Sequence, residues 1–379
     1  MVKFLHTADW QMGAKSFQLG SKAGEGRKLR LQSIRNIVSV AKKENVDFVL
    51  IAGDMFEDPD VNESVVRSTI EVLNGLGPIQ IFIIPGNHDP FVPGGVWDRI
   101  SWKEIKDHIH LLMRPEEYEL DSNLAIYPCP LKQKMGKTDP TSWIPLREKG
   151  DIRIRIGLAH GSLDIVKEPN FPIAADRVQK SGLDYLALGD WHGLFIQNRL
   201  VYPGTPEQTS YSDKNPGNVA LVTITREGEE PVIQTQRVGV LNWIEMNPLI
   251  QDSSDIDALE RELSKIADKS NTVLKIKSKI SSTLQSEGFE RLKNIRDKLS
   301  KELWHLDWSQ DNDKINDFML SQIPTGMLEV VRDSLLKLLR GESLEPELKD
   351  LQSKYNPDTA AEAIQLLYRL SSEGRIDDT

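Results

Sequence analysis

The sequence predicts an α/β protein with two facing sheets. Near the start of the chain, three short apolar runs each end in a polar or glycine-containing loop, which is the rhythm of alternating strands and helices. These runs cover residues 3–5, 47–52 and 79–84. Apolar residues between them recur at helical spacing, so a helix is expected after each of the first two strands. A second set of strand-like runs covers residues 154–159, 185–189, 200–202 and 219–225.

The pattern changes after about residue 241. A charged helix, an alternating strand and another helix are expected at 255–267, 273–280 and 288–303, which indicates a small α+β domain. From about Asp311 the chain is rich in Leu, Glu, Lys and Arg at helical spacing. We therefore divide the chain into a main domain (1–240), a small α+β domain (241–310) and a helical tail (311–379).

Composition excludes several classes of protein. The chain has 379 residues, with 47 Lys and Arg against 57 Asp and Glu and a net charge of −10, so it is not a histone-like basic protein. Cys129 is the only cysteine, which excludes a disulfide-dependent secreted scaffold and favours a reducing compartment. Neither a signal peptide nor a membrane span is expected, and a cytoplasmic location is the simplest interpretation.

Five short clusters of Asp, Asn and His fall at the ends of expected strands, where active sites of layered α/β folds gather. They are Asp9 to Gln11, Gly53-Asp54, Gly86 to Asp89, His160-Gly161 and Gly189 to His192. One such cluster alone is usually a helix cap or a turn. Together they predict a site for two divalent cations about 3.5–4 Å apart, because such a pair needs ligands from several segments and a bridging carboxylate.

This ordered set of clusters resembles the calcineurin-like metallophosphoesterase superfamily. Within it, four segments are similar to the DNA double-strand-break repair nucleases of the SbcD and Meiotic Recombination Eleven family. They are HTADW at 6–10, AGDMF at 52–56, DYLALG at 184–189 and YPGTPE at 202–207. The resemblance covers about residues 1–210. It implies a four-layer α/β/β/α fold, followed by a capping domain and a helical tail.

The resemblance also implies a role for each candidate residue. Asp54 would bridge the two metals; Asp9, Gln11 and His192 would surround one metal, and Asn87, His160 and Asp190 the other. His88 would protonate the leaving oxygen or hold the scissile phosphate, with Asp89 available to orient its ring. The implied reaction is phosphodiester hydrolysis by water without a covalent enzyme intermediate, with both endonuclease and 3′-to-5′ exonuclease activity.

Two residues depart from the family pattern. Gln11 and Asp190 each stand where the pattern has histidine, so the site gains oxygen ligands and a negative charge. Oxygen ligands suit hard cations, and we therefore expect Mn²⁺, or Mg²⁺, rather than Zn²⁺. Glu57 stands where relatives commonly place His or Asp, so an accessory contact to DNA also differs.

Contacts with DNA and partners are expected from the last third of the chain. Lys275, Lys277 and Lys279 alternate along one strand, which fits either a row of phosphate contacts or a solvated strand protected by lysine. The tail either packs back on the catalytic domain or, as the resemblance implies, docks on an SbcC-like coiled-coil ABC ATPase. The resemblance also implies a homodimer.

The sequence thus favours a two-metal DNA nuclease that works on DNA ends with an SbcC-like ATPase. Two alternatives stay open: a phosphodiesterase for small nucleotides, and a catalytically weakened scaffold that binds DNA ends.

Overall fold

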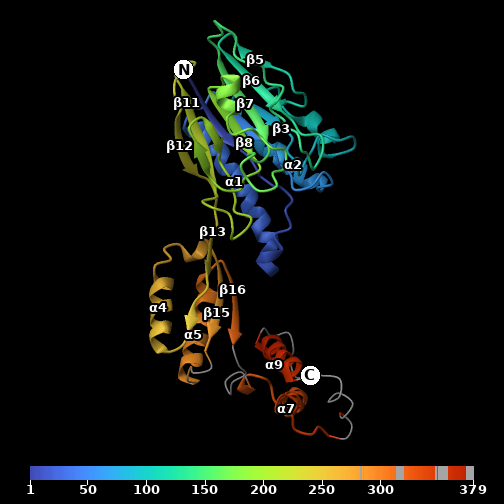
Figure 1. Cartoon of the computed structure of the whole chain (residues 1–379), viewed down its shortest axis with the longest axis vertical. Helices are drawn as coiled ribbons and strands as arrows, with labels where there is room; N and C mark the ends of the chain where they lie inside the picture. Colours follow the sequence, from blue (N-terminus) through green and yellow to red (C-terminus); the bar gives the residue numbers. More distant parts are fainter. Residues whose placement is uncertain (282–283, 285, 313–319, 346–347, 349–356, 373–379) are drawn as a thin grey trace. The chain divides into compact units, whose positions relative to one another are not determined.

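The computed structural model describes residues 1–281, 284, 286–312, 320–345, 348 and 357–372. The chain forms two compact units, Met1–Asn242 and Trp243–Thr379 (Figure 1). No helix in the described ranges is both long enough and apolar enough to cross a bilayer.

The first unit contains a sheet in the order β12-β11-β1-β2-β3-β4. β1, β2, β3 and β4 run parallel, and β11 pairs antiparallel with β1. Its strands are β1 (Val2–Thr7), β2 (Phe48–Ala52), β3 (Gln80–Ile84), β4 (Ile109–Leu111), β11 (Asn218–Ile224) and β12 (Val232–Arg237).

A second sheet has the order β5-β6-β7-β8-β10-β9. β6, β7, β8 and β10 are parallel, whereas β5 and β9 pair antiparallel at the two edges. Its strands are β5 (Tyr118–Asp121), β6 (Leu124–Cys129), β7 (Ile154–His160), β8 (Tyr185–Gly189), β9 (Phe195–Gln197) and β10 (Leu200–Tyr202).

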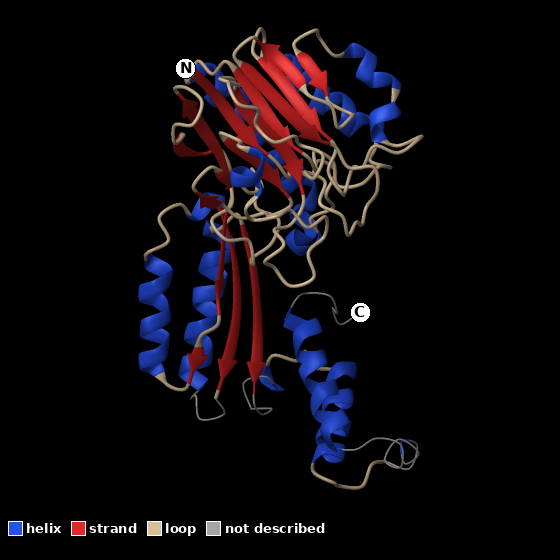
Figure 2. Cartoon of the chain, turned by 45° about the horizontal axis from the view of Figure 1, so that its top comes forward, coloured by secondary structure: helices blue, strands red, loops and turns tan. Residues whose placement is uncertain are grey.

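Three apolar clusters hold these layers together. Residues of α1 (Ala23–Lys43) and α2 (Glu63–Asn74) pack on one face of the first sheet. Its other face meets the second sheet, where Phe4 stacks on Phe48 with ring centroids 5.0 Å apart. The far side of the second sheet is covered by the short helix α3 (Arg177–Ser181) and neighbouring loops. The four-layer α/β/β/α prediction is confirmed (Figure 2).

Short 3-10 helices occur in the loops, at η1 (Phe17–Lys22), η2 (Val96–Asp98), η3 (Ile100–Glu104) and, in the second unit, η4 (Lys269–Asn271).

The second unit contains a small sheet with two helices on one face. β15 (Thr272–Ile280) pairs with β13 (Asn242–Met246), β14 (Leu249–Ile250) and β16 (His305–Asn312). Apolar residues of α4 (Ser253–Ser264) and α5 (Ser286–Glu302) pack on β15 (Figure 2). An α+β arrangement was expected here, but β16 was not. Because β16 continues to Asn312, the expected start of the helical tail at Asp311 is wrong.

Two helices follow and pack on each other. They are α7 (Met327–Leu339) and α9 (Pro357–Ser372), which share a small apolar core that includes Ile323 and Ile364. α7 ends two residues before Gly341, and α9 begins at Pro357. The rest of the expected tail, 313–319, 346–347, 349–356 and 373–379, lies outside the described residues.

Candidate metal centre

The candidate ligands lie at the carboxyl ends of strands from both sheets. Asp9 and Asp54 follow β1 and β2 by two residues, and Asn87 follows β3 by three. His160 ends β7, and Asp190 directly follows β8. Because the two sheets face each other, these strand ends bring side chains from distant parts of the sequence into one pocket.

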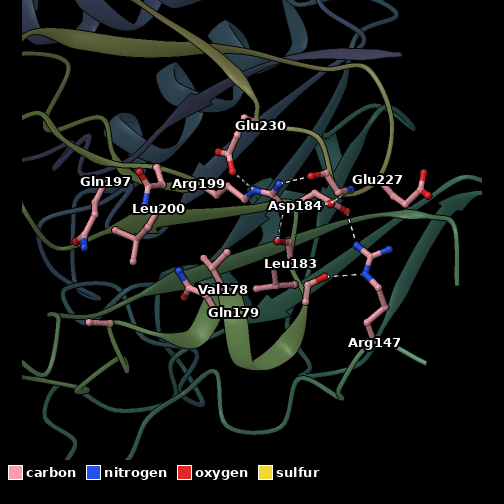
Figure 3. A pocket seen from close by; sticks show the side chains of 14 residues that line it. Arg147, Val178, Gln179, Leu183, Asp184, Gln197, Arg199, Leu200, Glu227 and Glu230 are labelled. Atoms are coloured by element: carbon pink, nitrogen blue, oxygen red, sulfur yellow. Dashed lines mark hydrogen bonds and ion pairs between the residues drawn. The ribbon is translucent and has the colours of Figure 1, made fainter. Parts of the chain in front are cut away.

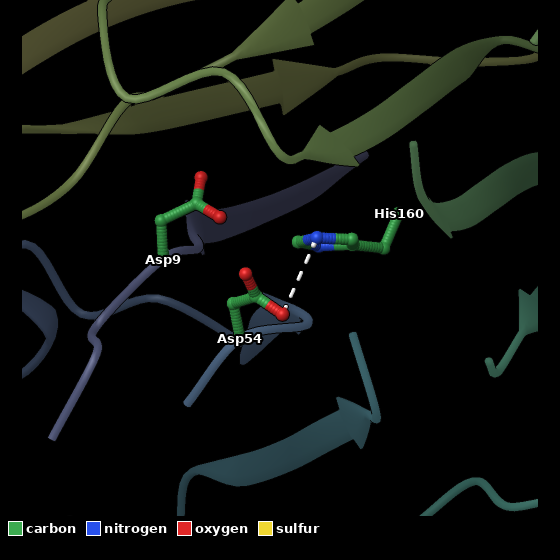
Figure 4. Close-up of side chains that lie close together, drawn as sticks. All are labelled: Asp9, Asp54 and His160. Atoms are coloured by element: carbon green, nitrogen blue, oxygen red, sulfur yellow. Dashed lines mark ion pairs between the residues drawn. The ribbon is translucent and has the colours of Figure 1, made fainter. Parts of the chain in front are cut away.

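The centre of the pocket is formed by Asp9, Asp54 and His160. One ligand atom from each lies within 4.8 Å of the others, and all three side chains are buried. The His160 ring points at Asp54, with 3.4 Å between Nε2 and Oδ1 (Figure 4). Its Nδ1 faces the Ala52 carbonyl oxygen at 2.8 Å, which leaves Nε2 directed at the cluster.

The charges in this pocket are not balanced by the protein. Burial, together with repulsion from Asp54 and Asp190, raises the pKa of Asp9 well above its ordinary value. Burial alone would lower the pKa of His160, but Asp54, Asp9 and Asp190 outweigh it and raise that pKa to about 10. His160 therefore interacts with all three acids, and added positive charge would stabilise the deprotonated cluster.

Asn87 and Asp190 lie on either side of this centre. The Oδ1 atom of Asn87 is 2.8 Å from Nε2 of His160. The backbone N–H of Asp190 donates to Asp9 at 3.0 Å, and its carboxylate accepts a 2.5 Å hydrogen bond from the Ser162 hydroxyl. Asp190 is thus fixed in place, although Ser162 was not identified from the sequence.

Gln11 and His192 meet at another edge of the site. The Nε2 atoms of the two side chains are 3.1 Å apart. On its other side, Nδ1 of His192 is 3.0 Å from the Thr209 hydroxyl, which itself donates to Asp213 at 2.9 Å. Since the hydroxyl hydrogen is used on Asp213, Thr209 accepts from Nδ1–H of His192. The lone pair of His192 is then on Nε2, the atom that faces the site.

His88 is held by groups other than the one expected. Its backbone N–H donates to Asp54 Oδ1 at 2.8 Å, and its ring Nδ1 lies 3.1 Å from the Glu57 carbonyl oxygen. Asp89 is fully buried, and its two carboxylate oxygens accept from the backbone N–H groups of Phe56 and Gly86. The expectation that Asp89 orients the His88 ring is therefore wrong: Asp89 braces the loop, and the Glu57 carbonyl orients the ring.

The backbone around the site is unusually constrained. Four candidate residues have positive φ angles in the range that L-residues seldom adopt: Asp9 (54°), Gln11 (46°), Asp54 (52°) and Asp190 (108°). Glycine is also required beside them. A Cβ on Gly53 would lie 2.5 Å from Nδ1 of His160, and one on Gly86 would overlap the Asp54 carboxylate. The segments are thus shaped to bring the ligands close together.

The lysine row of β15 lies in the second unit, whereas the metal cluster belongs to the first. Its residues alternate as expected, with Lys277 and Lys279 exposed and Ile276 and Ile280 buried. Two of the lysines have acidic neighbours on adjacent strands: Lys277 pairs with Glu245 at 2.7 Å, and Lys275 lies 3.9 Å from Asp307. These ion pairs favour a charge-compensated sheet face over an open row of cations.

A separate pocket of about 400 Å³ lies at the opposite ends of the second-sheet strands (Figure 3). Its buried acid, Asp184, accepts from Arg147 at 2.5 Å and from the backbone N–H of Gly228 at 2.7 Å. Arg199 pairs with Glu230 at 3.1 Å. Because these charges are paired with one another within the protein, we interpret the residues around this pocket as a structural network and not as a reaction site.

Divalent cations fit the first pocket well. The donor set is rich in oxygen, with carboxylates from Asp9, Asp54 and Asp190 and amide oxygens available from Gln11 and Asn87. The two imidazoles each present Nε2 to the site. Cations would also relieve the excess of buried negative charge described above.

Comparisons with known proteins agree with this chemistry. The chain is 27% identical over 242 residues to an uncharacterized metallophosphoesterase, YhaO, of Bacillus subtilis, covering 59% of this chain and 58% of that protein. It is 29% identical over 262 residues to the DNA double-strand break repair protein Mre11 of Aeropyrum pernix, covering 63% and 61%. Mre11 of Methanosarcina mazei is 23% identical over 60% of this chain and 37% of that protein.

The chain therefore spans less than two thirds of the length of these relatives. A family profile described as calcineurin-like phosphoesterase matches residues 2–194, a range that contains all the candidate metal ligands. The chain belongs to the calcineurin-like phosphoesterase family, whose members use divalent metals to hydrolyse phosphoester bonds.

Proposed function

We propose that this protein is a two-metal nuclease that hydrolyses phosphodiester bonds in DNA, as an endonuclease and a 3′-to-5′ exonuclease at DNA ends. The observation that carries the proposal is the convergence of Asp9, Asp54 and His160 in one buried cluster. Similarity to Mre11 proteins from two archaea supports DNA as the substrate.

Each side chain would have a distinct task. Asp54 lies at the centre and would bridge the cations; Asp9, Gln11 and His192 would hold one cation, and Asn87, His160 and Asp190 the other. Such cations supply Lewis acidity toward the phosphoryl group and lower the pKa of water. We propose Mn²⁺, or Mg²⁺, because the donors are mainly oxygens.

His88 is the candidate general acid. Its Nδ1 faces the Glu57 carbonyl oxygen, so the Nε2 atom is left for the substrate. When the ring is protonated, Nε2–H can donate to the departing sugar oxygen; afterwards the neutral ring keeps its Nδ1 hydrogen on Glu57. The Glu57 carbonyl thus positions the ring in both protonation states.

The second unit would supply DNA and partner contacts. The lysine row of β15 would contact phosphates, in competition with Glu245 and Asp307. Helix α7 exposes Met327, Val330 and Val331, which is an apolar face suited to a protein partner. We propose that the SbcC-like ATPase docks on these helices, and that the nuclease unit forms a homodimer.

The test compares substrates. Purified protein is mixed with Mn²⁺ and either linear or hairpin DNA, or a cyclic mononucleotide. The proposal expects DNA cleavage that is lost in Asp54→Asn and His88→Ala. Hydrolysis of the cyclic nucleotide alone would favour the small-nucleotide phosphodiesterase, and DNA binding without cleavage would favour the scaffold; either result would contradict the proposal.

A further inference from the structure

A cleft of about 850 Å³ opens beside the metal cluster. Gln11 and Thr209, whose side chains form hydrogen bonds with His192, line one part of it. Glu57, whose carbonyl faces the His88 ring, lines another. A substrate whose scissile phosphate lies on the cluster would therefore extend into this cleft.

Arg30, on α1, also lines this cleft and is a buried cation with few partners. Only 4% of its surface is exposed. Its Nη1 atom reaches the carbonyl oxygens of Trp10 and Glu207 at 3.4 Å each, which are long contacts. Its Nε atom has no hydrogen-bond partner among the residues that the structure describes. Trp10 lies between Asp9 and Gln11 in the sequence, so the guanidinium group sits against the backbone of the metal-binding loop.

This arrangement is costly unless another group completes it. Buried charges are normally paired and buried donors normally bonded. Burial lowers the pKa of Arg30, while the carboxylates of Glu207, Glu57 and Asp213 oppose the shift through their charge. Arginine nevertheless stays protonated in proteins, so the positive charge persists. An anion that enters the cleft would supply the missing partner.

Other groups that line the cleft suit a nucleotide. Arg27 and Lys15 are exposed and line the cleft, and Phe17 beside them is 77% exposed. The Lys15 Nζ atom lies 5.9 Å from the centre of the Phe17 ring. The remaining lining includes Glu57, Asp58 and Asp60, which would repel an anion. A phosphate is thus directed toward the arginines that line the cleft, and the exposed ring of Phe17 is available for stacking on a base.

We propose that this cleft is a binding site for a second substrate phosphate, next to the scissile one, and that Arg30 is its main protein ligand. The inference rests on the proposed phosphodiesterase function. It assigns Arg30 to the recognition of polynucleotides, because a substrate with a single phosphate could not use it. Arg27, Lys15 and Phe17 would support the same nucleotide.

The experiment compares Arg30→Met with Arg35→Met in the full-length protein. Arg35 lies on the same helix, is exposed and does not line the cleft, so it controls for the loss of a positive charge. Each variant is assayed with Mn²⁺ on a short oligothymidylate, which has several phosphates, and on bis(p-nitrophenyl) phosphate, which has one. The loss of a charged hydrogen bond predicts a KM for the oligonucleotide about 10-fold to 100-fold higher in Arg30→Met. The increase in KM for bis(p-nitrophenyl) phosphate should be at least about tenfold smaller than the increase for the oligonucleotide.

A second part of the experiment, the binding arm, measures affinity and does not depend on catalysis. In EDTA, the wild-type protein should bind 5′-phosphorylated dithymidylate more tightly than unphosphorylated dithymidylate, and inorganic phosphate should compete. Where Arg30→Met fails to fold, Arg30→Lys replaces it. A smaller loss of affinity is then expected, because lysine keeps the positive charge but lacks the planar fork of the guanidinium group. Equal behaviour of the Arg30 and Arg35 variants on the oligonucleotide, or equal binding of the two dithymidylates, would overturn the inference. Failure to cleave either substrate would instead count against the proposed function, while the binding arm still decides the role of Arg30.

Discussion

At the scale of single residues, the site depends on close approaches that only particular side chains permit. The ligand atoms of Asp9, Asp54 and His160 lie within 4.8 Å of one another because glycines stand behind them. Positive φ angles at Asp9 and Asp54 turn the two loops so that both carboxylates face the cluster. Small changes in volume at these positions should therefore alter chemistry more than stability.

Gly86→Ala tests this directly. The new Cβ would overlap the Asp54 carboxylate and backbone nitrogen, so Asp54 must move. A displacement of this kind is expected to lower kcat/KM for bis(p-nitrophenyl) phosphate by about 100-fold. Gly24→Ala is the control, because the nearest atom to its Cβ is a flexible Arg27 nitrogen at 3.8 Å. Comparable activity of the two variants would show that the Gly86 contact is unimportant.

His6 provides a pH-dependent test of the core behind the site. It is fully buried, and burial lowers its pKa to about 3 from 6.5. Between these pH values the unfolded chain binds a proton at His6 and the folded chain does not. The free energy of unfolding should therefore fall as the pH drops, by about 1.4 kcal/mol per pH unit from this residue.

His6→Gln should remove that contribution while an amide hydrogen bond to the Tyr185 hydroxyl remains possible. Urea unfolding at pH 6.5, 5.5 and 4.5 measures the effect. The variant should lose less stability than the wild type across this range, and an identical pH dependence in both proteins would contradict the assignment.

The metal ligands could be located from the sequence, but the residues that support them could not. The positions of Asp9, Asp54, Asn87, His160 and Asp190 were predictable because each follows an apolar run that forms a strand. The role of Asp89 was not, since its partners are backbone N–H groups that no side-chain pattern reveals. Ser162, Thr209 and Asp213 were missed because hydroxyl contacts to distant ligands leave no periodic signal.

At the scale of elements, hydrophobic runs determined which strands could be recognised. β2 and β8 are buried along their whole length and were predicted nearly to the residue. β6 is equally buried but contains Pro128, which argues against a strand in sequence analysis. β12 and β16 are rich in polar residues, so their strand character depends on pairing with neighbours rather than on apolar pattern.

The lysine row of β15 gives an element-scale prediction. Glu245 and Asp307 already compensate Lys277 and Lys275, so DNA phosphates would have to compete with them. The test replaces Lys275, Lys277 and Lys279 by Ser in one variant and measures the slope of log affinity against log salt concentration. Three unpaired lysines on phosphates would each contribute to this slope, whereas the ion-paired lysines should reduce it by only about one when they are removed. Fluorescence anisotropy with labelled duplex DNA measures this slope. A reduction of about three would show that the ion pairs do not restrain the lysines.

At the scale of the whole molecule, the two units have separate apolar cores. The core residues of the first unit all precede residue 242, and those of the second follow it. Every candidate metal ligand belongs to the first unit. Residues 1–242 should therefore fold alone and bind Mn²⁺ with an affinity close to that of the full chain. Circular dichroism tests whether the fragment folds, and calorimetry tests whether it binds Mn²⁺. A fragment that is unfolded, or that does not bind Mn²⁺, would show that the first unit needs the second.

The proposed two-metal site depends most on Asp54, the group that both cations would share. Electron paramagnetic resonance during Mn²⁺ titration reports both the number of bound ions and the magnetic coupling between them. The wild-type protein is predicted to bind two coupled Mn²⁺ ions, and Asp54→Asn, with nearly the same volume, should lose the coupling and at least one ion. Two coupled ions in the variant, or none in the wild type, would contradict the role of Asp54 as the shared ligand.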